Sequence, residues 1–242
     1  PIGLITNIIS RIKILATLNI TEKRLPQDGR FAFHHNEHSF DCRVSTCPTQ
    51  HGEKAVIRLL NHQTEKRSLQ QLGMSDSLLN KIQPQLKKPQ GMILVTGPTG
   101  SGKTQTLYSM LEYLHQDHLN ICTIEDPVEI TVPGINQTQT NEKIDLSFAT
   151  VLRSLLRQDP DIIMLGEIRD QETADIAIRA AQTGHLVLTT LHTNNTYKTL
   201  HRLLNLGIEP YNLIDCINLI IAQRLVRTLC PHCKTALSEA EK

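Results

Sequence analysis

One segment combines the residue types that hold a phosphate chain: Gly97-Pro98-Thr99-Gly100-Ser101-Gly102-Lys103-Thr104. It fits the pattern G-x-x-x-x-G-K-[ST] and lies between an apolar run and a helical pattern, the context that this motif requires. Glycines let backbone N–H groups turn toward phosphate oxygens, and the start of the following helix favours the same anions. We expect Lys103 to reach the β- and γ-phosphates and the Thr104 hydroxyl to bind Mg²⁺. The alternative is a glycine-rich turn that holds no ligand.

A carboxylate follows a second apolar run. Glu167 comes directly after the run from Ile162 to Gly166. A parallel strand beside the phosphate loop would bring Glu167 to the water shell of Mg²⁺, where it could orient the metal or polarise a water. The aspartate that usually ends such a strand is replaced here by Gly166 and Glu167. Taken alone, Glu167 could equally be a surface residue.

Three carboxylates end another apolar run, in Glu125-Asp126-Pro127-Val128-Glu129. Such a group is repulsive unless a cation lies nearby, and Mg²⁺ beside an attacking water would supply one. Pro127 stiffens the turn and limits where Glu129 can point. The alternative is a solvated acidic turn.

Two histidines flank the apolar run from Leu186 to Thr190. His185 or His192 could sense the γ-phosphate or transmit its loss. A single histidine in a turn is more often structural, so this interpretation depends on the other motifs.

All of these residues stand at the ends of apolar runs, so the hydrophobic pattern predicts the elements that position them. The expected strands are Met92 to Thr96, Ile121 to Glu125, Ile162 to Gly166 and Leu186 to Thr190. The expected helices are Thr104 to His115, Phe148 to Arg157, Gln171 to Gln182 and Tyr211 to Arg224. Strands that alternate with helices predict an α/β fold, with a mostly parallel sheet covered on both faces.

The preceding part of the chain has a different pattern. Apolar residues at three- and four-residue steps predict an amphipathic helix over residues 4–18. Asp28-Gly29 suits a tight hairpin turn, and strand-like patterns follow over Phe31 to Phe33, Phe40 to Val44 and Ala55 to Leu60. We therefore expect a small α+β domain over residues 1–66 and a second domain over residues 67–242.

Composition argues against several classes of protein. The 242 residues include 25 Lys plus Arg and 24 Asp plus Glu, and this near balance argues against binding nucleic acid through bulk charge. Aromatic residues make up only 3%, with no Trp, so stacking platforms for single strands are not expected. Neither a transmembrane helix nor a signal peptide is indicated. The six cysteines do not resemble a secreted disulfide framework, which favours a reducing cytosol.

In this order, four segments resemble the motifs of the type II secretion and type IV pilus assembly ATPase superfamily. They are Gly97 to Thr104 (Walker A), Glu125 to Glu129 (Asp box), Gly166 to Asp170 (Walker B) and Thr183 to Thr193 (His box). Two more stretches are similar to sequences of the family, Glu22 to Arg30 and Ala222 to Val226. The resemblance covers nearly the whole chain, and the pair Cys230 and Cys233 resembles the secretion and pilus-extension branch.

This resemblance implies a Mg²⁺-dependent ATPase that powers type II protein secretion or type IV pilus or pseudopilus assembly. It implies a RecA-like P-loop domain, incomplete at its C-terminal end, preceded by a partial PAS-like N-terminal domain. It further implies a homo-hexamer at the cytoplasmic face of the inner membrane, with membrane platform proteins as partners and no direct contact with nucleic acid. By motif match, Glu129 would be the general base and Glu167 would assist through Mg²⁺. His192 would sense the loss of the γ-phosphate.

The resemblance also points to four arginines. Arg153 and Arg157 look like arginines that reach nucleotide phosphates, and their spacing places them on one face of a helix. Arg43 and Arg58 resemble arginines of the N-terminal domain that approach the nucleotide as that domain closes. An arginine opposite the γ-phosphate offsets developing charge. The alternative for each is a surface arginine.

Several features depart from the family pattern. The chain begins at Pro1 rather than Met and is expected to be a piece truncated at both ends. Full members of this branch carry a second Cys-x-x-Cys pair, whereas Cys230 and Cys233 alone would form a poor, partial zinc site, so zinc binding is possible only in the full-length protein. Asn194-Asn195 stands where the family often has an acidic residue at the second position. His34, His35 and His38 are expected to be solvated rather than a metal cluster.

Two rival functions remain open from the sequence. The chain could be a nucleotide-binding assembly piece that does not hydrolyse ATP, which its truncation favours. It could also be a nucleic-acid motor of the conjugation or helicase type, which its near-neutral charge and Cys-x-x-Cys tail disfavour.

Overall fold

The computed structural model of the chain describes residues 2–35, 38–61, 67–230 and 232–235, and it divides into two compact units. The N-terminal unit is Pro1–Glu65 and the C-terminal unit is Lys66–Lys242. The domain boundary expected at residue 66 falls in the stretch 62–66, outside the described residues.

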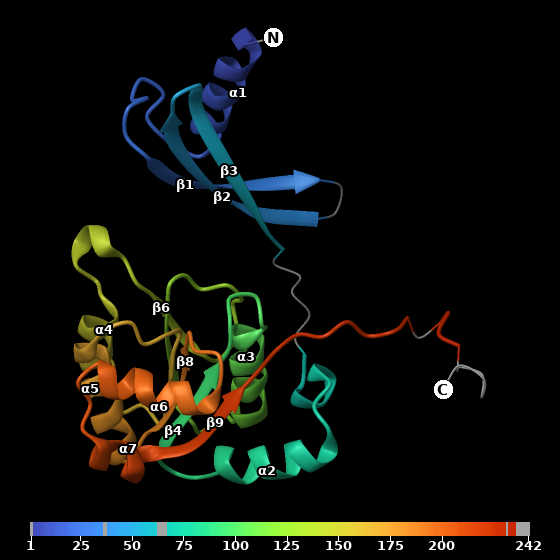
Figure 1. The fold of residues 1–242 in the computed structure, drawn as a ribbon. Coiled ribbons are helices and arrows are strands. Elements are labelled where there is room, and N and C mark those ends of the chain that lie inside the picture. The colour runs from blue at the N-terminus through green and yellow to red at the C-terminus, as the bar shows by residue number, and fades with distance from the viewer. Residues whose placement is uncertain (1, 36–37, 62–66, 231, 236–242) are drawn as a thin grey trace. The chain divides into compact units, whose positions relative to one another are not determined.

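In the N-terminal unit, one helix accompanies a three-stranded antiparallel sheet (Figure 1). Its elements are α1 (Ile2–Leu15), β1 (Gln27–His35), β2 (His38–Thr49) and β3 (Gly52–Asn61), with strand order β1-β2-β3. The helix buries Ile9 and the stem of Lys13, whose ammonium pairs with Glu53 of β3 and donates to the backbone oxygen of Glu22 at 2.7 Å. This pairing offsets the cost of burying the lysine charge.

The predicted hairpin turn at Asp28-Gly29 is wrong, because both residues lie inside β1, paired with Ser45 and Val44. A Cβ at Gly29 would come within 2.4 Å of the backbone oxygen of Ala16. Glycine is therefore needed there for the close approach of the chain that leaves α1, and not for a turn. The helix predicted over residues 4–18 runs over Ile2–Leu15.

The C-terminal unit contains a six-stranded parallel sheet in the order β6-β5-β7-β8-β4-β9. Its strands are β4 (Gly91–Thr96), β5 (Ile121–Glu125), β6 (Asn136–Gln139), β7 (Ile162–Leu165), β8 (Leu186–Leu191) and β9 (Ile217–Ala222). Its α-helices are α2 (Asp76–Leu86), α3 (Lys103–Leu114), α4 (Phe148–Leu155), α5 (Gln171–Gln182), α6 (Thr196–Asn205) and α7 (Pro210–Cys216). Two 3₁₀ helices complete it, η1 (Leu69–Leu72) and η2 (Glu142–Ile144).

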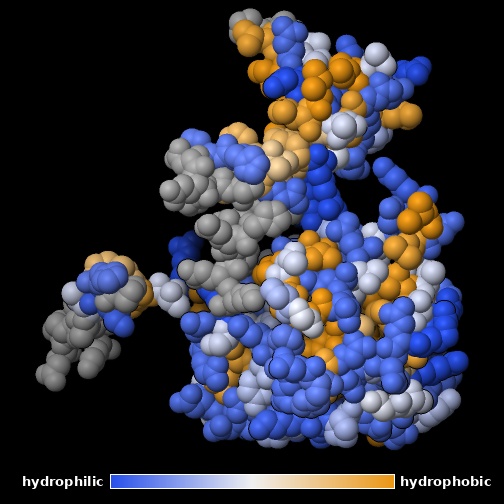
Figure 2. Space-filling view, turned by 180° about the vertical axis from the view of Figure 1, so that it is seen from behind, coloured by the Kyte–Doolittle hydropathy of each residue, from blue (hydrophilic) through white to orange (hydrophobic). Residues whose placement is uncertain are grey.

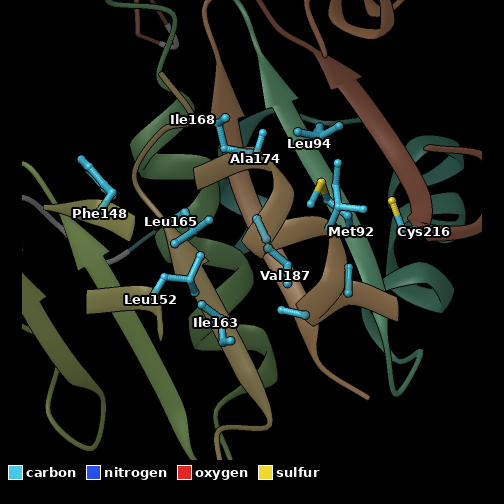
Figure 3. Packing of buried hydrophobic residues seen from close by; sticks show 14 of the residues in the cluster. Met92, Leu94, Phe148, Leu152, Ile163, Leu165, Ile168, Ala174, Val187 and Cys216 are labelled. Carbon is cyan, nitrogen blue, oxygen red and sulfur yellow. The ribbon is translucent and has the colours of Figure 1, made fainter. Parts of the chain in front are cut away.

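Apolar cores cover both faces of this sheet. Met92 and Leu94 of β4 belong to a core beneath α4, α5 and α7, part of which is drawn in Figure 3. Ile93 and Val95, which alternate with them, belong to a second core beneath α2, α3 and η1. Strands buried on both faces read as continuous apolar runs, which is why the sequence revealed them.

Short polar side chains start the helices around the site. Ser147 accepts a hydrogen bond from the Thr150 N–H at 3.2 Å, Asp170 from Thr173 at 2.8 Å, and Asn195 from Lys198 at 2.8 Å. These bonds satisfy backbone donors that a helix start leaves open. Asn and Asp cap equally well, so the departure from the family pattern at Asn195 leaves this role intact.

The helix predicted over Tyr211 to Arg224 is wrong in its second half. The helix α7 ends at Cys216, and the chain continues as β9, which pairs with the edge of β4. The apolar run satisfies both periodicities, but as a strand it places Leu219 against one core and Ile220 against the other. Pairing with β4 therefore decides in favour of a strand over a helix. The sequence patterns also missed α2, β6 and α6.

Apolar side chains appear among polar ones on the surface of both units (Figure 2). On α1 the exposed ones include Leu4, Ile5, Ile8 and Ile14. Within the described residues, no helix has both the length and the apolar character needed to cross a bilayer.

Candidate nucleotide-binding site

The phosphate loop, residues 97–102, joins β4 to α3. Gly97, Gly100 and Gly102 have φ angles of +155°, +78° and +83°, which residues with a Cβ rarely adopt. Gly102 is the N-cap of α3, so the loop leads directly into the helix start. The Ser101 N–H donates to the Pro98 oxygen at 3.2 Å and closes a turn within the loop.

Lys103 folds back over this loop. Its buried ammonium donates to the backbone oxygens of Gly97 (3.0 Å) and Pro98 (3.2 Å). Burial lowers the pKa of Lys103, and the negative charge of Glu167 partly opposes this shift. An ammonium has three protons, so one remains for a phosphate oxygen.

The loop fits a polyphosphate. A Cβ at Gly100 would meet no atom within 4 Å, so the backbone there is open to a ligand. The Ser101 hydroxyl oxygen is buried and has no hydrogen-bond partner among the described residues, which is costly unless a ligand provides one. Mg²⁺ is usually held by one or two carboxylates together with substrate phosphates, and Thr104 and Glu167 are the groups that would hold it here.

Glu167 lies just beyond β7, in a charged cluster. It pairs with Arg169, which also bridges to Asp126 at 3.0 Å. Burial disfavours the charge of Arg169, but hydrogen bonds and charges from Glu167 and Asp126 outweigh burial and raise its pKa. The Asp box and the Walker B segment are thus joined through Arg169, a residue to which the sequence reasoning gave no role.

His192 completes this cluster, because its Nε2 lies 2.8 Å from an oxygen of Glu167. His185, by contrast, lies at the start of β8, and its Nδ1 is 3.0 Å from the Ala180 oxygen. Since all strands are parallel, the two histidines lie at opposite edges of the sheet. The structural alternative therefore applies to His185, and His192 is the one beside the carboxylate.

Threonine hydroxyls connect the ends of the central strands. The Thr193 N–H donates to the Thr96 hydroxyl at 3.1 Å, and the hydroxyls of Thr193 and Thr199 are 2.7 Å apart. The Thr190 hydroxyl donates to the Gly166 oxygen at 2.7 Å. The His box is therefore tied to the phosphate-loop strand on one side and to the Walker B strand on the other.

The three carboxylates of the Asp box have different environments. Glu125 is buried and accepts hydrogen bonds from Tyr108, from Thr123 at 2.6 Å and from Gln137 at 3.1 Å. Burial and the charge of Glu125 raise the pKa of Tyr108, so this hydroxyl stays a donor. Asp126, as described above, pairs with Arg169. Glu125 is therefore enclosed within the protein, whereas Asp126 is exposed and paired with Arg169 at the surface.

Glu129 is exposed. The residue after it is held at both backbone groups, since the Ile130 N–H donates to the Tyr108 hydroxyl at 3.4 Å and the Ile130 oxygen accepts from Gln137 at 2.9 Å. The Glu125 network therefore anchors the loop that carries Glu129, while the Glu129 carboxylate itself faces solvent.

Gln223, directly after β9, was missed as a functional residue. Its amide nitrogen donates to the Ser101 oxygen at 2.6 Å, and its amide oxygen accepts from Thr106 of α3 at 2.8 Å. Its neighbour Arg224 donates to the Asn194 oxygen at 2.7 Å. The only sequence signal was the resemblance of Ala222 to Val226 to the family, which carried no role.

Arg153 and Arg157 are exposed. Arg153 pairs with Glu172 of α5, and the Arg157 guanidinium donates to the Arg153 oxygen at 2.9 Å. The helix α4 ends at Leu155, two residues before the end predicted at Arg157. In the described structure their recorded polar contacts lie outside the phosphate loop.

Arg43 and Arg58 lie in the N-terminal unit, on β2 and β3, and are direct partners in the strand register. On the other side, Arg43 is the partner of Arg30 on β1. Three arginines thus form a row across the sheet. The sequence separation hid this row, because only the register of the strands brings Arg30 beside the other two.

Cys230 and Cys233 form no disulfide and are exposed. Hydrogen bonds from the backbone of His232 and Cys233 lower the pKa of Cys230. Among the described residues, no group of three or more His, Cys, Asp or Glu side chains is arranged to hold a metal ion.

Comparison with known proteins identifies relatives of the whole chain. The family model "Type II/IV secretion system protein" matches residues 1–242. The chain is 54% identical to the type II secretion system protein HxcR of Pseudomonas aeruginosa, covering 94% of the chain and 48% of the relative. It is 55% identical to the type IV pilus assembly ATPase PilB of Myxococcus xanthus, covering 97% and 42%. The chain therefore spans about half the length of these relatives.

Solved structures share the fold. The pilus retraction motor PilT with bound ADP superposes with a TM-score of 0.69 at 37% identity, over 84% of this chain and 60% of that chain. The ATPase DotB of Yersinia pseudotuberculosis superposes with a TM-score of 0.74 at 27% identity, over 92% and 64%. The architecture is that of the secretion and pilus ATPases, as the sequence motifs predicted.

Proposed function

The chain belongs to the type II/IV secretion system protein family, and we propose that it is the ATP-hydrolysing part of a motor for type II protein secretion or type IV pilus assembly. The observation that carries this proposal is the convergence of Lys103, Glu167 and His192 at the carboxyl edge of one parallel sheet. In open α/β sheets this edge is where ligands bind.

The proposed reaction is attack of water on the γ-phosphate of ATP, in line with the leaving group. The loop N–H groups and Lys103 bind the phosphates and balance the charge that develops on them. Mg²⁺, when bound, would neutralise charge on the β- and γ-phosphates. Thr104 and Glu167 would hold that ion.

We assign the general base to Glu129. Its carboxylate is exposed, whereas Glu125 is buried in three hydrogen bonds and Asp126 is paired with Arg169. A base needs a carboxylate that can reach a water, and an anchored loop holds such a group in place at low entropic cost.

His192 and the threonines beside it would transmit loss of the γ-phosphate. His192 contacts Glu167, and Thr193 is tied to Thr96 just before the phosphate loop. A change at the γ-phosphate would reach β8 and β4 through these contacts. Conversion of such loss into movement is a known kind of switch in phosphate-binding proteins.

The arginines of the N-terminal unit support a composite site. The strand register places Arg30, Arg43 and Arg58 in one row, and guanidinium groups are well suited to bind a polyphosphate. Arg153 and Arg157 are exposed on the C-terminal unit and would serve the same purpose after exchanging their present partners, Glu172 and the Arg153 oxygen, for phosphate. We propose closure of the N-terminal unit on the nucleotide within a homo-hexamer. This hexamer would lie at the cytoplasmic face of the inner membrane, and its partners would be membrane platform proteins.

The decisive experiment is Mg²⁺-dependent ATP hydrolysis per subunit over a range of protein concentrations. Lys103→Ala and Glu129→Gln are tested beside the parent chain, with Glu142→Gln, an exposed glutamate of η2, as matched control. We expect turnover that rises with concentration, survives in the control and is lost in the other two variants.

Other outcomes identify the rival functions. Nucleotide binding without turnover at any concentration would indicate a nucleotide-binding assembly piece that does not hydrolyse ATP. In that case the part of the relatives that this chain does not span would be needed for hydrolysis. Strong stimulation of turnover by DNA would favour a nucleic-acid motor.

A further inference from the structure

Gln223 contacts the phosphate loop through its side chain, in addition to the backbone hydrogen bond that extends β9. Its backbone N–H donates to the Thr96 oxygen at 2.9 Å, which continues the ladder between β9 and β4. Its side chain then crosses the loop, with the amide nitrogen on the Ser101 oxygen (2.6 Å) and the amide oxygen on the Thr106 hydroxyl (2.8 Å). Ser101 and Thr106 are both buried, so these bonds lie largely out of water.

Gln223 also leaves no room for a side chain at two glycines of the loop. A Cβ at Gly97 would lie 2.6 Å from the backbone oxygen of Gln223, and a Cβ at Gly102 would lie 3.1 Å from its amide nitrogen. The loop therefore has Gln223 packed against its start and its end. Only residues without a Cβ can pass so close.

The hydrogen bond to Ser101 also orients the loop backbone. In a trans peptide the C=O and the following N–H point in opposite directions. Because the Ser101 oxygen points to Gln223, the N–H of Gly102 points to the other side of the peptide. Backbone N–H groups of this loop are the donors that would bind phosphate.

We propose that Gln223 is a positioning residue that sets the phosphate loop in its binding geometry before nucleotide arrives. It would act through the Ser101 carbonyl and the Thr106 hydroxyl, without touching the nucleotide itself. This inference rests on the proposed binding of ATP by the loop. Preorganisation of this kind raises affinity because less ordering is left for the binding step.

Arg224 extends the arrangement to the His box. Its guanidinium donates to the Asn194 backbone oxygen at 2.7 Å, two residues after His192. Adjacent residues of the segment after β9 thus hold the phosphate loop and the loop that follows β8. The strand that the sequence pattern read as a helix is the element that brings them there.

The test measures affinity for ATP and ADP in the 242-residue chain with Gln223→Glu and Gln223→Leu. Glutamate can still accept from Thr106 but cannot donate to the Ser101 oxygen, and leucine can do neither. Gln223→Leu loses both hydrogen bonds and should weaken binding by about three- to tenfold. Gln223→Glu should bind more weakly still, because it would add a negative charge against the loop that binds phosphate.

Two further variants make the test specific. Gln182 is a half-buried glutamine whose amide donates to the Asn212 oxygen at 3.4 Å, far along the chain from the loop, so Gln182→Glu is the matched control and should bind as the parent does. Thr106→Val removes the second contact, together with the bond of the Thr106 hydroxyl to the Gly102 oxygen at 3.2 Å, and should weaken binding about twofold to threefold. Combined with Gln223→Leu, it should weaken binding less than it does alone, because the contact between Thr106 and Gln223 is already lost.

Hydrogen exchange separates positioning from a general loss of structure. Without nucleotide, amides of residues 97–104 should exchange faster in Gln223→Leu, while amides of α5 and the melting temperature stay at parent values. Affinities within twofold of the parent, with unchanged exchange in the loop, would overturn the inference. So would loosening spread over the whole C-terminal unit. Failure of the parent chain to bind ATP, with Lys103→Ala indistinguishable from it, would instead contradict the proposed function on which the inference rests.

Discussion

The imidazole of His192 lies 2.8 Å from the carboxylate of Glu167, although the two residues follow different strands. The contact exists because β7 and β8 are neighbours in the sheet and both end at the same edge. It connects the expected Mg²⁺ ligand with the expected sensor of the γ-phosphate.

Replacing His192 tests this contact. We expect His192→Ala to lower kcat by about tenfold to hundredfold with little change in the Kd for ATP, as is typical when the partner of a metal-binding group is removed. His185→Ala is the control, because His185 lies at the opposite edge, and it should leave kcat unchanged. Single-turnover hydrolysis and equilibrium binding measure the two effects. Equal losses in both variants would argue against a special role for His192.

The affinity for ATP should depend on pH through Lys103. Burial lowers the pKa of this ammonium below its ordinary 10.5 in the free protein, and bound phosphate favours the charged form. Affinity should therefore be constant at neutral pH and fall as pH rises through the lowered pKa, where the free protein loses the proton. Binding titrations between pH 7 and pH 10 would show this as a rising Kd. The residual binding of Lys103→Ala should lack the step.

Substitution of Glu129 should lower activity, whereas substitution of Glu125 should lower stability. Glu129→Gln should lose about 10²- to 10⁴-fold in kcat while binding ATP and unfolding as the parent does, because it removes a proton acceptor and no buried contact. Glu125→Gln should reduce the free energy of unfolding by about 1–3 kcal/mol, because it replaces an acceptor of three buried hydrogen bonds. Urea denaturation and kcat together distinguish the two. A Glu125→Gln variant of full stability would contradict the structural role.

Two glycines of the loop provide a matched pair. Gly97→Ala should prevent the native loop conformation, because a Cβ there would lie 2.5 Å from the Ser101 hydroxyl and 2.6 Å from the Gln223 oxygen. Gly100→Ala meets no atom within 4 Å and should cost only about 1 kcal/mol of backbone strain at positive φ. Nucleotide binding and melting temperature check both variants. Equal behaviour would mean that the packing of Gln223 on the loop is looser than described.

Local sequence determined the parts of this protein whose signal is contained in a short stretch. The phosphate loop could be found because its glycines and Lys103 are contiguous, and β4, β5, β7 and β8 because strands buried on both faces are continuous apolar runs. Four motifs in a fixed order identified the family.

Tertiary structure decided what depends on pairing between distant segments. The stretch after Cys216 fits a helix or a strand by pattern alone, and only the open edge of β4 made it β9 and so brought Gln223 to the loop. Likewise, the strand register placed Arg30 beside Arg43. Packing of α3 with its Tyr108 made Glu125 a buried hydrogen-bond acceptor, whereas Glu129 stayed exposed. Hydrogen bonds between strands and the burial of a carboxylate are energies of the assembled fold, so no local run of residues can specify them.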